Sequence, residues 1–172
     1  MNEIIGQSLG IIATIITFIS YQVNTKSRLL IIQTSATFCT CLSFLFLGAS
    51  TGFALNIVCI ARNISFYFQK DKSRAHTATA LSLALVMIVL GIFSWQGPES
   101  LLIMIALAAN TLFMATGDPQ LLRKSVIVTS GMILAYNAIV FSIGGMTNEG
   151  ISIISSIIGI IRFSKEASKE EV

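Results

Sequence analysis

Charged residues are scarce in this chain of 172 residues, because Asp, Glu, Lys and Arg together make up only 11% of it. Soluble domains usually carry about a quarter charged residues, and a small domain has a large surface for its volume. Eight acidic and eleven basic residues cannot provide a polar coat. A soluble enzyme, a nucleic-acid-binding protein and a disordered chain are therefore disfavoured. The hydrophobic share of 54% predicts an integral membrane protein that contacts membrane lipids.

The residue sets that enzymes and metalloproteins use are also missing. The chain has one histidine and three cysteines, and the cysteines lie within apolar runs, where they fit as small buried hydrophobes. No Cys/His cluster has metal-site spacing, and the chain has neither a P-loop nor a dinucleotide-binding glycine motif. We therefore expect no enzymatic activity, no cofactor and no metal site, and ATP cannot drive this chain alone.

Long apolar runs dominate the sequence instead. A membrane-spanning helix needs about 20 mostly apolar residues, and seven segments meet this requirement. They show no alternation of apolar and polar residues, so the sequence predicts helices rather than barrel strands. The expected spans are Ile4–Gln22, Leu29–Leu47, Thr51–Gln69, His76–Trp95, Leu101–Asp118, Ser125–Gly144 and Asn148–Ser164.

The few cations predict how these helices are oriented. Lys and Arg gather in short cytoplasmic loops of membrane proteins. The links after the first, third and fifth runs and the C-terminal tail hold nine cations, whereas the other links and the N-terminus hold none. The sequence therefore predicts an N-terminus outside the cell and a cytoplasmic C-terminus. The two remaining cations, Arg62 and Arg162, fall within spans.

The two halves of the chain repeat one order of features, with an offset of about 96–100 residues. Gln22 aligns with Gln120, and Arg62 aligns with Arg162. Repeats of this kind occur in many transporters. Because the fourth run has no counterpart, we expect two parallel three-helix bundles joined by an inverting linker helix. The expected units are the first bundle (1–70), the linker helix (71–98), the second bundle (99–165) and a short charged cytoplasmic tail (166–172).

Motifs in the first half resemble those of the SWEET sugar transporters of the PQ-loop group. The segment from Gly10 to Gln22 is similar to that family's Gly-x-x-Ala-x-x-x-Thr-x-x-Ser-Phe pattern, which normally runs on to Pro-Gln. Asn56 is similar to the family's substrate-contacting Asn. Phe44, four residues before Gly48, is similar to its pocket aromatic. The resemblance implies a seven-helix carrier of small solutes.

The second half follows this pattern less closely. It keeps the pair Pro119-Gln120, whereas the first half has no proline before Gln22. Its pocket aromatic corresponds to Val140 or Phe141, depending on the alignment. Serines stand where a second Asn is expected, at positions 152, 155 and 156. The resemblance therefore does not assign a sugar as the substrate.

Over the whole chain, the sequence is similar to YgjV-like bacterial inner-membrane proteins. The segment Leu45–Phe68 resembles that family's Leu-Gly-Ala…Thr-Gly-Ala…Asn…Arg-Asn stretch. The resemblance implies a location in the bacterial inner membrane. It brings no activity with it.

Polar residues within the spans are the candidate binding residues. Ionisable groups in a membrane are costly and often functional. Arg62 either holds an anionic group inside the protein or extends its guanidinium to the interface. Asn and Ser either line a cavity or join helices by hydrogen bonds. The candidate substrate-binding residues are Asn56, Phe44, Arg62, Asn63, Ser155 and Asn137. The candidate gating or hinge residues are Ser20, Gln22, Pro119 and Gln120, and Pro119 is expected to end or bend the fifth helix.

These features favour a carrier of a small polar solute, either sugar-like or a small organic anion. Two three-helix bundles would rock around a site near the membrane midplane. No acidic residue is expected at mid-membrane, so the sequence offers no carrier for a coupled proton. The alternative is a membrane interaction, assembly or lipid-contacting protein that does not transport. The sequence is compatible with a homo-oligomer and indicates no nucleic-acid partner.

Overall fold

The computed structural model describes residues 2–20, 26–69, 74–116 and 119–170. These residues form seven α-helices and short turns, with no strand among them. The helices are α1 (Asn2–Ser20), α2 (Lys26–Phe46), α3 (Ser50–Phe68), α4 (Arg74–Phe93), α5 (Ser100–Thr116), α6 (Pro119–Ile139) and α7 (Ile143–Glu170). The expected all-helical class and the number of helices are confirmed in this part of the chain.

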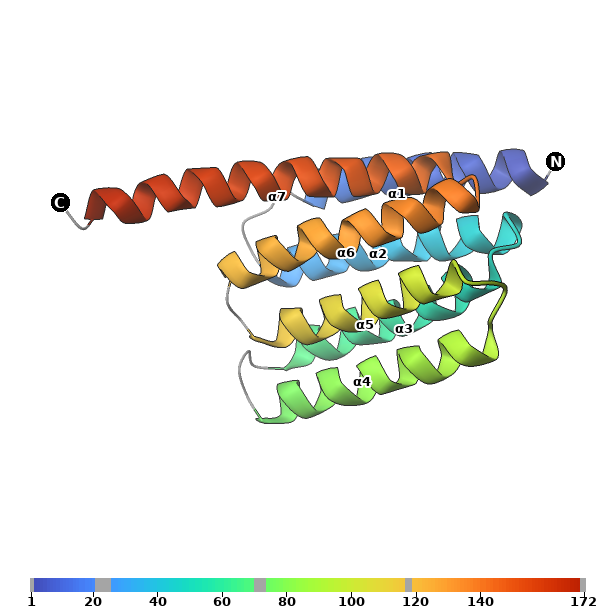
Figure 1. Ribbon diagram of the computed structural model, residues 1–172, viewed down its shortest axis with the longest axis horizontal. Coiled ribbons are helices and arrows are strands. Elements are labelled where there is room, and N and C mark those ends of the chain that lie inside the picture. The colour runs from blue at the N-terminus through green and yellow to red at the C-terminus, as the bar shows by residue number, and fades with distance from the viewer. Residues whose placement is uncertain (1, 21–25, 70–73, 117–118, 171–172) are drawn as a thin grey trace.

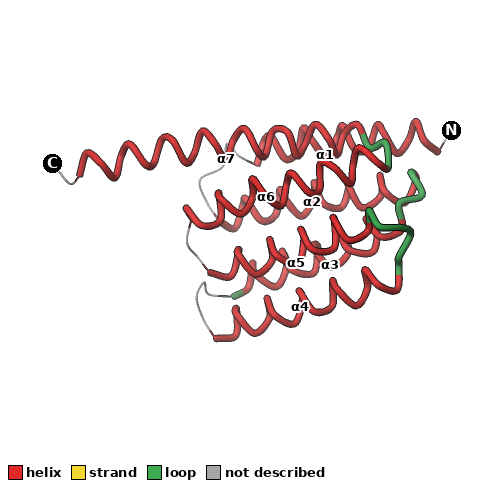
Figure 2. The backbone as a smooth tube through the Cα atoms, in the orientation of Figure 1, coloured by secondary structure: helices red, strands yellow, loops and turns green. Residues whose placement is uncertain are grey.

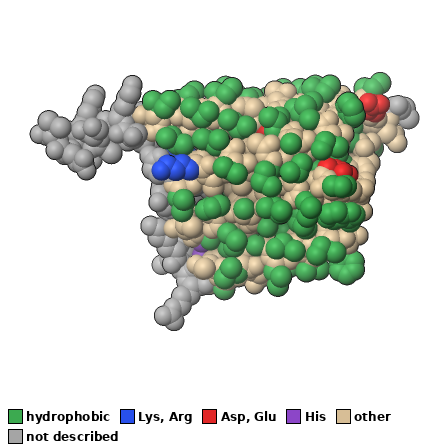
Figure 3. Space-filling view, in the orientation of Figure 1, with side chains coloured by type: hydrophobic (Ala, Val, Ile, Leu, Met, Phe, Trp, Pro, Cys, Tyr) green, Lys and Arg blue, Asp and Glu red, His purple; other side chains and the backbone are tan. Residues whose placement is uncertain are grey.

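The outer surface suits a lipid environment. Three helical segments are long and apolar enough to cross a membrane, namely Asn2–Ile19, Ala75–Phe93 and Ile143–Ile161, and two shorter apolar helical segments are Leu30–Phe46 and Ser100–Thr116. Figure 3 shows hydrophobic side chains spread over α4 to α7, with few charged groups on that face. Helices satisfy their own backbone hydrogen bonds, which a chain in lipid requires.

The helices form two facing rows. One row holds α1, α2 and α3, and the other holds α5, α6 and α7 (Figure 1). Because α1 also packs on α7 and α3 on α5, six helices form a closed ring in the order α1, α2, α3, α5, α6, α7. Helix α4 lies outside this ring against α3 and α5. Each triplet is thus a row of sequential neighbours rather than a separate closed bundle.

Contacts around this ring follow the repeat. A shift by three places around the ring exchanges α1 with α5, α2 with α6 and α3 with α7. The hydrophobic core lies to one side, where α3, α4 and α5 bury apolar side chains such as Leu55, Met87 and Ile103.

The three described turns lie at one end of the molecule, which we call the turn end (Figure 2). Two of them share one geometry. The amide of Ala49 donates to the carbonyl of Phe44 at 2.9 Å, and the amide of Ser142 donates to that of Asn137 at 2.8 Å. Each turn holds one residue with positive φ, Gly48 at 74° and Phe141 at 54°. The matched turns are therefore 93 residues apart (141 minus 48), fewer than the 96–100 expected from the alignment.

This shorter offset corrects the limits of the last two helices. Helix α6 starts at Pro119, whereas we expected a span beginning at Ser125. Helix α7 starts at Ile143 rather than Asn148, and it has 28 residues, or about 42 Å at 1.5 Å per residue. Pro119, which we expected to end or bend the fifth helix, lies outside α5 (Ser100–Thr116). It opens α6, where a proline's missing amide proton costs nothing.

Candidate functional site

A cavity of about 750 Å³ lies inside the helix ring. All six ring helices contribute to its wall, and α4 contributes no lining residue. Many lining side chains are polar. Hydroxyls come from Thr17, Thr37, Thr40, Ser43, Ser130, Ser142, Ser152, Ser155 and Ser156, and amides come from Gln33, Asn56, Asn63, Asn110, Asn137 and Asn148.

The six residues predicted to bind a substrate all line this one cavity. Phe44, Asn56, Arg62 and Asn63 come from the first triplet, and Asn137 and Ser155 from the second. The position of the predicted gating side chains relative to the cavity stays a prediction. Gln22 lies outside the described residues, as do the side chains of Ser20, Pro119 and Gln120.

Arg62 is held inside the protein by neutral partners. Only 7% of its surface is exposed. Its Nε and Nη2 donate to Oδ1 of Asn63 at 3.2 and 3.1 Å, and its Nη1 donates to Oγ1 of Thr111 on α5 at 3.2 Å. A guanidinium has five N–H donors, so two of them remain without a partner among the described residues. Of the two alternatives for Arg62, the structure favours the interior position over extension to the interface.

Asparagines from both rows have unpaired amide oxygens and line the cavity, Asn56 and Asn137 among them. Asn56 donates through Nδ2 to the carbonyl of Gly52 at 2.8 Å, and its Oδ1 has no partner among the described residues. The Oδ1 of Asn137 is buried and has no hydrogen-bond partner. Buried polar atoms are almost always paired. Both residues line the cavity, so their amide oxygens are candidate acceptors for a solute.

The cavity is closed towards the turn end by contacts between the two rows. The rings of Phe44 and Tyr136 pack edge to face with centroids 5.9 Å apart. The Tyr136 hydroxyl accepts a hydrogen bond from the amide of Gly52 at 3.0 Å. A Cβ at Gly52 would lie 2.9 Å from both side chains, so only glycine allows this contact. Phe44 thus closes one end of the cavity.

Helices α1 and α7 extend this closure. The hydroxyl of Thr14 donates to the carbonyl of Gly144 at 2.8 Å. A Cβ at Gly144 would lie 2.2 Å from the backbone of Gly10. Glycine at both positions lets the helix backbones touch, as small residues do in membrane helix pairs.

Towards the opposite end the wall becomes more polar and charged. Gln33 on α2 and Arg123 on α6 line the cavity there, and both side chains are half-buried. Arg123 also lies against α7, because a Cβ at Gly159 would meet its Nε at 2.9 Å.

Glu149 is the functional candidate that the sequence analysis missed. We expected it at the edge of the span that begins at Asn148, but it lies six residues after the start of α7, and it lines the cavity. Its carboxylate accepts hydrogen bonds from the Ser130 hydroxyl and from Asn148, the latter at 3.2 Å. An acidic residue therefore lies within a helical segment that is long and apolar enough to cross a membrane, Ile143–Ile161. Matching the 47–49 turn to residues 140–142 would have revealed this, because the last helix then begins at Ile143 and position 149 lies well inside it.

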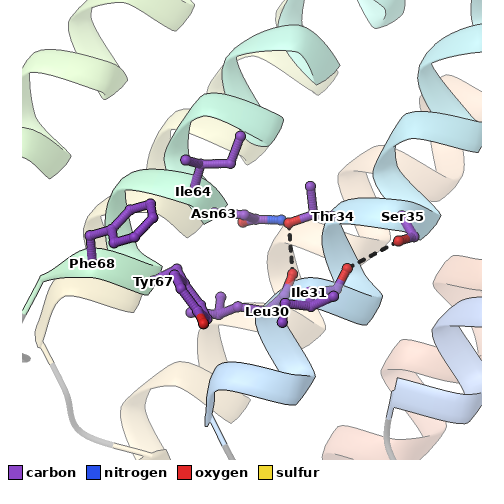
Figure 4. A pocket seen from close by; sticks show the side chains of 8 residues that line it. All are labelled: Leu30, Ile31, Thr34, Ser35, Asn63, Ile64, Tyr67 and Phe68. Atoms are coloured by element: carbon purple, nitrogen blue, oxygen red, sulfur yellow. Dashed lines mark hydrogen bonds between the residues drawn. The ribbon is translucent and has the colours of Figure 1, made fainter.

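A second, smaller pocket of about 350 Å³ lies between α2 and α3 (Figure 4). Its wall is mainly apolar, with Ile31, Ile64 and Phe68. The hydroxyls of Thr34 and Ser35 donate to carbonyls one turn earlier in their own helix, at 2.6 and 3.2 Å. These hydroxyl protons are not available to a ligand, so the ring cavity is the stronger candidate site.

Comparison with known proteins gives one match. The family model Imp-YgjV, described as bacterial inner membrane protein, matches residues 4–167. No curated protein matches the chain. No solved structure matches it either.

Proposed function

This chain belongs to the Imp-YgjV family of bacterial inner membrane proteins, and we propose that it carries a small polar solute across that membrane. One observation carries the proposal: residues from both helix triplets line a single polar cavity. Its volume of about 750 Å³ lies within the usual range for small-molecule pockets, about 300–1,000 Å³. A protein that only held other subunits together would need no such cavity.

The lining favours an anionic solute over a neutral one. Arg62 is buried, is bound only to neutral groups among the described residues, and keeps two N–H donors free. A guanidinium binds a carboxylate or phosphate through paired hydrogen bonds. The unpaired oxygens of Asn56 and Asn137 would accept hydrogen bonds from hydroxyl groups of the same solute. A small organic anion that also has sugar-like hydroxyls fits both sets of groups.

Rocking of the two triplets would move the solute. In this state the Phe44–Tyr136 contact closes the turn end, which the cation distribution predicts to face outside. Separating the rows at that contact, and joining them near Arg62 and Arg123, would expose the site to the other side. The motif resemblance to SWEET transporters supports the same kind of cycle. No energy source is required by this step.

Uptake by proteoliposomes tests the proposal. Labelled gluconate, succinate, glucose and ethanolamine provide anionic, neutral and cationic probes. Hydrogen bonds to charged groups contribute about 1.5–3 kcal/mol, so Arg62→Ala should reduce anion uptake by roughly tenfold to a hundredfold. Asn56→Ala should reduce uptake of the hydroxylated anion more than that of succinate.

Lys124→Ala is the matched control, because Lys124 is exposed and does not line the cavity. It should transport as the wild type does. If no probe enters wild-type proteoliposomes faster than protein-free liposomes, the carrier proposal is wrong. In that case the non-transporting interaction role takes its place.

A further inference from the structure

Among the described residues, one acidic side chain lines the cavity, and the proposed carrier function does not use it. Glu149 is partly buried in the wall and is held by Ser130 and Asn148. Building on the proposed function, we propose that Glu149 binds the proton that couples this carrier to a proton gradient. One anionic solute would cross together with one proton.

The surroundings of Glu149 allow both the charged and the neutral carboxyl. Helix α7 packs against α6 and α1. From α6, Ser130 hydrogen-bonds to the carboxylate, and the Tyr136 hydroxyl is engaged with the amide of Gly52. Arg123 lies seven residues before Ser130, which is roughly 10 Å along the helix.

The other charged side chains that the structure describes on the packed helices do not line the cavity. Lys124 on α6 and Glu3 on α1 are exposed outside the cavity. No cation forms an ion pair with Glu149 among the described residues. A neutral set of hydrogen-bonding partners does not fix the charge of a carboxyl group, whereas a salt bridge would.

Charge balance in the cavity then gives the coupling. Without solute, the positive charge of Arg62 and the negative charge of Glu149 sum to zero. Arg123 is half-buried near the beginning of α6, and its charge can stay in contact with solvent. Binding of a monovalent anion at Arg62 leaves one net negative charge in the cavity.

Protonation of Glu149 removes that excess charge. The proton comes from water on one side, binds a carboxyl oxygen of Glu149, and is released to water on the other side; no other bond is made or broken. Moving an uncompensated charge through a low-dielectric interior costs several kcal/mol. The two triplets therefore rock in only two forms of the protein. One is empty and has Glu149 ionised, and the other holds the anion and has Glu149 protonated. Both are neutral.

The test uses full-length protein in proteoliposomes that contain a pH-sensitive dye, with labelled gluconate as the probe. An inward gradient of one pH unit should accumulate gluconate about tenfold for one proton per anion. The lumen should acidify at the same time. The initial uptake rate should not respond to a membrane potential set with potassium and valinomycin.

Glu149→Gln keeps the size and hydrogen-bonding capacity of the side chain but cannot release a proton. We expect gradient-driven accumulation and acidification to be lost, while exchange of labelled for unlabelled gluconate continues. Glu149→Asp should retain accumulation, and Glu3→Gln, the control on an exposed carboxylate, should behave as the wild type.

Three results would overturn the coupling. These are gluconate uptake without acidification in the wild type, undiminished accumulation in Glu149→Gln, and loss of exchange in both Glu149 variants. The first of them leaves the carrier proposal intact, because uptake itself is then observed. If the wild type shows neither uptake nor exchange of any probe, the carrier proposal fails and the coupling fails with it.

Discussion

Phe141 occupies a backbone conformation that L-residues other than glycine seldom adopt. Its φ of 54° lies in the same left-handed region as the 74° of Gly48 in the matched turn of the first triplet. The left-handed region costs an L-residue roughly 1–2 kcal/mol. The Phe141 side chain is 75% exposed, so packing within the protein returns little of this energy. The strain is maintained by the α6–α7 turn as a whole, including the Ser142-to-Asn137 hydrogen bond.

Replacing this phenylalanine with glycine should therefore stabilise the protein. Glycine removes the strain but loses more entropy on folding, about 0.5–1 kcal/mol, so Phe141→Gly should raise the free energy of unfolding by up to about 1 kcal/mol. Denaturant unfolding in detergent micelles measures it. Gly48→Ala, at a site with no atom within 4 Å of an added Cβ, should lower stability by a similar amount. Equal stability of the wild type and Phe141→Gly would contradict this account.

The contact between α1 and α7 depends on two glycines at the helix level. A Cβ at Gly144 would meet the backbone of Gly10 at 2.2–2.6 Å, and a backbone cannot rotate away as a side chain does. Gly144→Ala must therefore push the two helices apart, at a cost of about 1–3 kcal/mol as for other overpacked sites. Thermal unfolding in micelles should show a lower midpoint.

Gly131 on α6 provides the matched control. An added Cβ there meets no atom within 4 Å, so Gly131→Ala should stabilise the helix by up to about 1 kcal/mol through propensity alone. Destabilisation by both alanines would mean that helix geometry, rather than the α1–α7 contact, accounts for the effect.

The helix limits could be predicted from the sequence for most of the chain, but not for the last two helices. Apolar runs with interspersed cations predicted seven helices, and the first five lie within three residues of the observed limits. The last two were misplaced because we expected Gly144 to end one span and Gly145 to begin the link to the next. Those glycines instead lie in α7, where Gly144 contacts Gly10 and Gly145 contacts Asn137. A phenylalanine takes the turn position that glycine usually holds, and no local rule predicts that.

The site could be predicted only as a set of residue types. Polar residues within apolar helices identified Asn56, Arg62 and Asn137 as candidate binding residues, because such residues are costly in lipid unless they face the interior. The order of helices around the ring decides that they share one cavity, and this order depends on long-range packing that a sequence pattern does not contain. Glu149 was missed because the last helix was expected to begin at Asn148, whereas it begins five residues earlier, at Ile143.

At the scale of the whole molecule, a rocking ring should expose its cavity to the two sides in turn. Cys59 reports on this, because it lines the cavity and is buried in this state. With Cys39 and Cys41 replaced by serine, a membrane-impermeant maleimide should label Cys59 faster from the predicted cytoplasmic side. The Phe44–Tyr136 contact closes the route from the turn end, so Tyr136→Ala should raise labelling from outside, and gluconate in the cavity should slow labelling from both sides.

Ser50→Cys in a cysteine-free background is the control for sidedness, since Ser50 is exposed at the turn end. It should react only from outside, whether or not Tyr136 is replaced. Two outcomes would contradict the rocking ring. If Tyr136→Ala leaves the labelling of Cys59 from outside unchanged, the aromatic contact does not control access. If Cys59 reacts from neither side in intact vesicles, the cavity stays closed to water and the two triplets do not move as a carrier requires.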